Sequence, residues 1–276
     1  MANTEFSLFR IKFVKPSQTN FIHQDKTPSE FFLEALKERP SFSHGERFTW
    51  HVGNLKEFSS LTGSFAIGRT SKSTVELFDA VTKNFKEAEF EESPNTTCLY
   101  DAEIGILVVA KKSLLNQNTI KLAEKVEQLL SNSEVILMNE IRVDVSPIPD
   151  PDGFIKRLSH ANRIFRFTAT FGGPNPFDAD EHFQKPMSVY LAKTRGTEGK
   201  TTVKGESLDP ETIVEVSKST AATGNQASAR IKRFKSSKPE TINLKGDPVK
   251  RRLDEAQLGL EKILELFIKL YHDIRN

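Results

Sequence analysis

Alternation of apolar with polar residues marks the strands that the sequence predicts. Phe6 to Val14 alternates in this way and places Phe9, Ile11 and Phe13 on one face. Other segments with strand patterns are residues 48–55, 64–70, 135–145 and 163–171. The apolar run within residues 96–111 has no polar alternation, which is typical of a strand buried on both faces. These patterns predict a core that is built largely from β-sheet.

The strand over residues 163–171 has the clearest two-sided pattern. Phe165, Phe167, Ala169 and Phe171 occupy the alternate positions that face inward. The intervening positions include Arg166, and they are mostly polar. We therefore expect one side of this strand to pack on a core and the other side to meet solvent.

Apolar residues at three- and four-residue steps predict the helices. Thr27-Pro28-Ser29-Glu30 combines an N-cap, a proline at the first helical position and a capping-box glutamate, so a helix begins there and ends near Glu38. Further helices are expected over residues 118–130, 154–160 and 209–222. Residues 75–85 show only weak helical spacing.

The last segment, residues 248–276, is predicted to be one long amphipathic helix with a wide apolar stripe. Gly259 lies inside it and costs about 1 kcal/mol relative to alanine. The stripe either docks on the chain's own sheets or pairs with a second copy in a homodimer. The sequence leaves both arrangements open.

Glycines and prolines at residues 172–176 end the strand that precedes them and predict a hinge. The expected fold class is α+β, with mixed or antiparallel sheets, packed helices and two domains. Residues 1–172 form an N-terminal sheet domain. Residues 173–247 form a basic module whose β-ribbon comprises residues 228–235 and 241–245, and residues 248–276 form the C-terminal helix.

Charge is distributed unevenly along the chain. Residues 185–252 carry fifteen Lys and Arg against seven Asp and Glu, although the whole chain has a net charge of only +2. Like charges in one stretch repel each other and give no benefit to folding. Binding of a polyanion explains such segregation, and nucleic acid is the usual polyanion.

The basic ribbon and the residues after it supply the candidate DNA-binding residues, each expected to contact a phosphate. They are Arg230, Lys232, Arg233, Lys235, Lys238, Lys245, Lys250, Arg251 and Arg252. A two-stranded ribbon can lie along a duplex backbone or enter its major groove. Phe234 is the only aromatic residue within the ribbon, and binding of single strands by stacking needs more. Double-stranded DNA is therefore the expected partner.

A metal-dependent nuclease is the competing enzymatic interpretation. Asp180 followed by Glu198-Gly199-Lys200 resembles the acid and acid-x-Lys pattern of restriction-type nucleases, in which carboxylates hold Mg²⁺. The glycines around Glu198 favour a turn instead. The sequence contains no phosphate-binding glycine motif and no metal-ligand spacing among its histidines. No catalytic residue, metal, cofactor or small-molecule substrate is expected.

Compartment follows from cysteine usage and from the lack of targeting patterns. Cys98 is the single cysteine, so no disulfide framework forms, and its apolar surroundings predict a buried strand residue. The first residues have neither the basic nor the apolar region of a signal peptide. The longest apolar run, residues 104–110, is too short to span a bilayer. We expect a cytoplasmic protein.

The order of elements resembles a known family. A buried strand that ends in cations (Ile104 to Lys112) precedes an amphipathic helix and a further strand. An alternating strand then ends in Gly-Gly-Pro-Asn-Pro-Phe-Asp (Gly172 to Asp178), before a basic region and a long C-terminal helix. This layout resembles the RexA-type phage-exclusion proteins and related phage-defence proteins, whose fold is similar to that of the recombination-associated protein RdgC.

The resemblance implies a two-domain α+β homodimer that binds duplex DNA with little sequence preference. It also implies a role in excluding superinfecting phage, in some systems alongside a membrane-protein partner. Our hypothesis is non-enzymatic, sequence-independent binding of double-stranded DNA in anti-phage defence. The alternatives are a metal-dependent nuclease and a protein-interaction module with an acidic partner.

Overall fold

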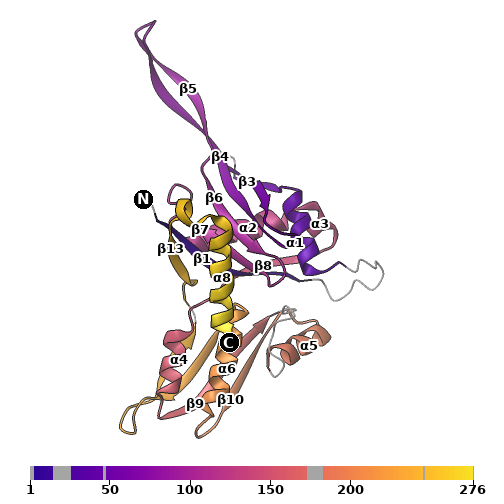
Figure 1. Ribbon diagram of the computed structural model, residues 1–276, viewed down its shortest axis with the longest axis vertical. Helices are drawn as coiled ribbons and strands as arrows, with labels where there is room; N and C mark the ends of the chain where they lie inside the picture. Colours follow the sequence, from indigo (N-terminus) through magenta and orange to yellow (C-terminus); the bar gives the residue numbers. More distant parts are fainter. Residues whose placement is uncertain (1–2, 15–25, 46–47, 173–182, 245, 276) are drawn as a thin grey trace.

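The computed structural model describes residues 3–14, 26–45, 48–172, 183–244 and 246–275. Within these ranges the chain forms two antiparallel sheets with packed helices, so the α+β class is confirmed. The two sheets follow one another along the long axis of an elongated molecule, and a narrow two-stranded arm extends from the end opposite the smaller sheet (Figure 1).

The larger sheet has nine strands, in the order β13-β1-β7-β6-β4-β3-β2, with β5 added to β4 and β8 added to β1. Its strands are β1 (Thr4–Val14), β2 (Ser41–His44), β3 (Phe48–Glu57), β4 (Thr62–Asp79), β5 (Asn84–Glu92), β6 (Asn95–Asp101), β7 (Ile106–Ala110), β8 (Arg142–Pro147) and β13 (Lys250–Leu253). The smaller sheet has four strands in the order β10-β9-β11-β12. These are β9 (Arg163–Gly172), β10 (Glu198–Lys204), β11 (Ala227–Lys232) and β12 (Glu240–Leu244).

Eight helices cover the sheets within the described part of the chain. They are α1 (Pro28–Lys37), α2 (Thr119–Ser131), α3 (Glu134–Met138), α4 (Asp152–Ser159), α5 (Gln184–Thr194), α6 (Pro210–Ala222), α7 (Glu255–Leu258) and α8 (Leu260–Arg275). The predicted start of α1 is confirmed: Thr27 and Glu30 form a reciprocal capping box, with Pro28 in the first turn. Asn118 and Asp209 likewise cap α2 and α6.

Two apolar clusters follow from the alternation of β1. Phe9, Ile11 and Phe13 pack with α1, α2 and α3 on one face of the larger sheet, as predicted. Phe6 and Leu8 face the opposite side, where one continuous cluster includes α8, α6, α4 and the apolar face of the smaller sheet. The two sheets therefore share a core and are not joined merely by a linker.

The prediction of a single C-terminal helix from residue 248 is wrong in its first half. Residues 250–253 form β13, which pairs with the start of β1, and only residues 260–275 form the long helix α8. Gly259 separates α7 from α8 with φ 78° and ψ 153°, a conformation that no helix contains. The apolar stripe of α8 docks on the chain's own core, where Ile263, Phe267 and Tyr271 are buried.

Two strand predictions also change in the structure. Residues 134–138 form α3, so the strand expected over 135–145 is reduced to β8. The strand expected over 96–111 is a hairpin of β6 and β7, because the turn at residues 102–105 includes Gly105 at φ 65°. All five residues of β7 are buried, as the apolar run at residues 104–110 predicted, and most of β6 is buried beside it.

The projecting arm is a two-stranded ribbon made from the far ends of β4 and β5 (Figure 1). It includes residues 75–85, whose pattern in the sequence is ambiguous. Near its tip Phe78 and Phe85 are opposite each other with ring centroids 5.4 Å apart, and Val81 is 92% exposed. None of the described residues between 72 and 91 belongs to either apolar cluster.

Candidate nucleic-acid interface

The smaller sheet has one apolar face and one polar face because apolar and polar residues alternate along most of its strands. Ile164, Phe167 and Ala169 of β9 face the helices, together with the alternate residues of β11 and β12. α4 and α6 pack on this apolar side. In the part of the chain that the structure describes, no helix covers the other side. That open face is lined by polar residues from all four strands.

Three cations form a row across the middle of the open face. Lys204 of β10 is directly opposite Arg166 of β9, and Arg166 is directly opposite Arg230 of β11. Side chains at directly opposed positions have their Cβ atoms about 4.5–5.5 Å apart, and like charges there destabilise a sheet. Lys204 and Arg230 are exposed, whereas Arg166 is partly buried between them. This row is the most concentrated positive charge on the sheet.

Further cations and hydroxyl groups lie on both sides of the row. Lys200 and Glu198 precede Lys204 on β10, and Arg163 is paired with Lys232 at the other end of β9. A row of short polar residues crosses the sheet next to the cations. It consists of Thr202, Thr168, Ser228 and Asn243. Thr168 Oγ1 and Thr202 Oγ1 are 3.0 Å apart, so neighbouring strands also interact through their side chains.

Electrostatic compensation on the open face is slight. Its strands carry six cations (Arg163, Arg166, Lys200, Lys204, Arg230 and Lys232) and the carboxylate of Glu198, and the carboxylate of Glu206 lies near Arg163 and Lys204 at one end of the face. Among the residues that the structure describes, none of these cations forms a salt bridge with a carboxylate. We call this set the basic face. It can present several uncompensated positive charges to one extended anion.

The nine residues predicted to bind DNA do not all converge on the basic face. Arg230 and Lys232 lie on it. Arg233, Lys235 and Lys238 belong to the turn between β11 and β12, where Arg233 forms a salt bridge with Glu240. Lys245 lies outside the described residues.

The three cations expected at residues 250–252 belong to the other sheet. Lys250, Arg251 and Arg252 are in β13, and ion pairs join Lys250 to Asp247 and Arg252 to Glu5. The prediction from charge density therefore grouped cations that lie on two separate surfaces, one on the smaller sheet and one at β13 of the larger sheet.

The structure adds four cations that sequence reasoning did not select for the site: Arg163, Arg166, Lys200 and Lys204. The sequence contains a usable signal for three of them. The alternation of residues 163–171 already placed Arg166 on the outward face. Lys200 and Lys204 alternate with Thr201 and Val203, but the glycines at 196, 199 and 205 indicated a turn instead. Residues 198–204 are in fact an edge strand.

A β-bulge alters β9 beside the basic face. Arg230 pairs with Arg166 and Ile231 pairs with Ile164, so Phe165 is the extra residue. The prediction that Phe165 faces the core is therefore wrong: Ile164 is fully buried in its place, and Phe165 is only partly buried. Phe165 lines a surface hollow of about 680 Å³ together with Arg163, Lys204, Gly205 and Glu206.

Only two of the three nuclease-like residues lie within the described part of the chain. Glu198 and Lys200 are two residues apart on β10 and both lie on the open face. Asp180 lies outside the described residues. Elsewhere in the described chain no group of three His, Cys, Asp or Glu side chains is placed to hold a metal ion.

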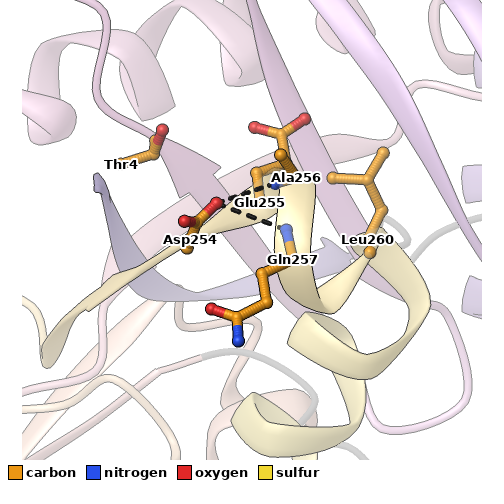
Figure 2. A pocket seen from close by; sticks show the side chains of 7 residues that line it. Thr4, Asp254, Glu255, Ala256, Gln257 and Leu260 are labelled. Atoms are coloured by element: carbon orange, nitrogen blue, oxygen red, sulfur yellow. Dashed lines mark hydrogen bonds between the residues drawn. The ribbon is translucent and has the colours of Figure 1, made fainter. Parts of the chain in front are cut away.

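Two other hollows are lined by polar groups that already serve the fold. In the hollow beside the start of β1, Asp254 accepts hydrogen bonds from the backbone N–H groups of Ala256 and Gln257 and so caps α7 (Figure 2). In the cleft between the two sheets, Glu127 accepts a 2.8 Å hydrogen bond from the N–H of Val145. Burial raises the pKa of the Glu127 carboxyl.

Cys98 is fully buried in β6, as predicted, and burial raises the pKa of its thiol. Such a group is a poor nucleophile. Across the described residues, no helix has the length and apolar character needed to cross a membrane. Comparison of the chain with protein-family models and with curated protein sequences finds no match.

Proposed function

We propose that this protein binds double-stranded DNA, without sequence preference and without catalysis, by laying the basic face along the phosphate backbone. The observation that carries the proposal is the row Lys204–Arg166–Arg230, in which three cations occupy directly opposed positions on three neighbouring strands. Such a row weakens the sheet by itself, so binding of a polyanion is the benefit that explains it.

The chemistry of the face favours contact with the backbone over contact with bases. Lys and Arg neutralise phosphates, and Ser, Thr and Asn side chains donate hydrogen bonds to phosphate oxygens. The basic face combines both groups across all four strands. Sheets that read single-stranded RNA carry aromatic residues on the open surface for stacking. Here one aromatic residue, Phe165, lies at the end of the basic face.

Paired variants with equal loss of charge test the assignment. Replacing Arg166 and Arg230 with threonine removes two cations from the basic face. Replacing Arg251 and Arg252 with threonine removes two from β13 in the other sheet. Binding to a duplex is measured by fluorescence anisotropy over a series of salt concentrations. Each lost phosphate contact lowers the slope of log K against log[salt] by about 0.9.

We expect the slope to fall by about 2 for the Arg166/Arg230 variant and to remain at the wild-type value for the Arg251/Arg252 variant. The loss of affinity should be equal for duplexes of unrelated sequence, because phosphates carry no sequence information. If the slope fell equally in the two variants, the basic face would not be the specific binding surface. An unchanged slope in both would reject the proposal.

The competing interpretations give different results with the same proteins. A nuclease would nick plasmid in the presence of Mg²⁺ or Mn²⁺, and Lys200→Ala would stop it. A module for an acidic protein partner would bind duplex DNA no more tightly than heparin.

The biological setting that we propose is exclusion of superinfecting phage in the cytoplasm, as the family resemblance suggests. Plaque counts on cells that express the wild-type chain or the Arg166/Arg230 variant test this setting. Protection by both proteins alike would separate DNA binding from defence.

A further inference from the structure

The hollow at the end of the basic face is lined by one aromatic residue, two cations and a carboxylate. Its lining residues are Arg163, Phe165, Lys204, Gly205 and Glu206, and its volume is about 680 Å³. Arg163 and Lys204 are also members of the basic face. The hollow and the face are thus one continuous surface.

The backbone holds Phe165 in this position. In the bulge, Phe165 leaves the alternation of β9, while Ile164 takes the core position and is fully buried. The segment that follows β10 fixes the bulge by two hydrogen bonds. The N–H of Gly205 donates to the carbonyl of Phe165 at 3.1 Å, and the N–H of Leu208 donates to the carbonyl of Ile164 at 2.8 Å. Bulges commonly re-aim a side chain next to a functional site.

From this geometry we propose that the hollow binds one unpaired nucleobase, stacked on the ring of Phe165, at the end of a duplex held by the basic face. A phenyl ring among cations is the arrangement that stacks bases in single-stranded nucleic acids. Arg163 and Lys204 contact the phosphates on either side of that base, and Glu206 accepts a hydrogen bond from an N–H group at the edge of the base. This inference rests on the proposed function and specifies its preferred substrate: duplex DNA with a single-stranded tail.

The composition of the hollow excludes a purely apolar occupant. An apolar side chain or a lipid tail would offer no partner to the two cations and the carboxylate that line the hollow. A nucleotide satisfies all three because it has a flat apolar base, an anionic phosphate and hydrogen-bond donors. With a single ring, one base is bound, and stacking tolerates any of the four bases.

The experiment compares two forms of the same duplex by fluorescence anisotropy at one salt concentration. One form is closed at both ends by hairpin loops, and the other has an unpaired thymidine tail at one end. The proteins are wild type, Phe165→Leu, Phe165→Trp and the control Phe234→Leu. Phe234 is an exposed phenylalanine in the β11–β12 turn and does not line the hollow.

We expect wild type to bind the tailed duplex about 5- to 150-fold more tightly than the closed duplex, the range for stacking of one base. Phe165→Leu should lose most of this preference, whereas Phe165→Trp and Phe234→Leu should keep it. Phe165→Trp adds a direct signal, because Trp50, the one tryptophan of the chain, is buried. The tailed duplex should quench the indole fluorescence of this variant, and the closed duplex should not.

Several results would overturn the inference. Equal affinity of wild type for the two duplexes would show that no unpaired base is bound. If the preference for the tailed duplex persisted in Phe165→Leu and disappeared in Phe234→Leu, the stacking residue would be Phe234 in the β11–β12 turn. If the proposed function itself is wrong, the result is different, because neither duplex would bind. Binding of the free tail with quenching of Phe165→Trp would in that case support the hollow alone.

Discussion

Under the proposed function, Arg166 would serve binding at the expense of stability. It is opposed on both sides by cations, Lys204 and Arg230. Threonine at this position would remove both repulsions and has a high preference for strands. We expect Arg166→Thr to raise the free energy of unfolding by about 0.5–1 kcal/mol at low salt while it weakens DNA binding.

Urea denaturation at two ionic strengths measures the stability of Arg166→Thr, and the gain should shrink as salt screens the repulsion. Arg251→Thr is the matched control, because Arg251 is opposite Phe6 and has no directly opposed cation. A gain that is independent of salt would point to strand propensity alone. A loss of stability would contradict the electrostatic account.

Single residues also mark the limit of prediction from sequence. The alternation of residues 163–171 correctly predicted that Phe167, Ala169 and Phe171 are buried, because these positions follow the bulge without interruption. It failed for Ile164 and Phe165, since one extra residue reverses the face of everything before it. The bulge is held by Gly205 and Leu208, which are distant in sequence, so no local pattern contains it.

At the scale of elements, Gly259 decides where the last helix begins. Its φ of 78° and ψ of 153° belong to a region that only glycine occupies readily. A helix through this position would predict that Gly259→Ala is stabilising by about 1 kcal/mol. The structure predicts the opposite sign, a loss of about 1–3 kcal/mol, because alanine would be strained there.

Thermal unfolding of Gly259→Ala, followed by circular dichroism, distinguishes these two signs. No atom lies within 4 Å of the position of an added Cβ at Gly259, so steric overlap does not contribute and the change reports backbone strain. Gly153→Ala is a suitable control. Gly153 lies inside α4, also with open space around an added Cβ, and alanine should stabilise that helix. Stabilisation by both substitutions would mean that the helix continues through residue 259.

Elements with strong local signals were predictable, and those that depend on distant pairing were not. The capping box at Thr27 and the N-cap at Asp209 lie within the segments that they start, so α1 and α6 were predicted almost to the residue. β13 has only four residues and forms because β1 offers an edge. Its partner is about 250 positions away, and the sequence in between contains no sign of the pairing.

At the scale of the whole molecule, the candidate site exists only when strands that are distant in sequence pair with one another. The basic face needs β10, β9 and β11 to pair in register, and the pairing of β9 with β11 joins residues about 60 positions apart. The charge density of the sequence led to the hypothesis of a polyanionic ligand, which stays a prediction, and it grouped the cations of β13 with those of β11. The distribution of charge along the sequence shows which segments are basic. It does not show which of these segments lie on the same surface, because that depends on which strands pair.

The arm provides a prediction at the same scale, because it projects from the end opposite the basic face (Figure 1). Its described residues contribute to neither apolar cluster, and an isolated two-stranded ribbon adds little to global stability. Lys72 and Glu91 are directly paired at its base, so residues 73–90 can be replaced by an Asn-Gly turn. We expect the shortened protein to keep the urea midpoint of the wild type and the same salt slope for duplex binding.

Equilibrium unfolding and the anisotropy titration on the shortened protein measure both quantities. A point variant, Phe85→Ser, controls for the loss of backbone, since Phe85 is 76% exposed and its side chain packs mainly on Phe78. A lower salt slope in the shortened protein would place phosphate contacts on the arm and would extend the binding surface over the full length of the molecule. A lower urea midpoint in the shortened protein alone would show that the ribbon supports β3 and β6, the strands on either side of β4 in the sheet. Retention of both values separates the molecule into a DNA-binding end and an arm whose exposed apolar tip is not needed for folding or for binding.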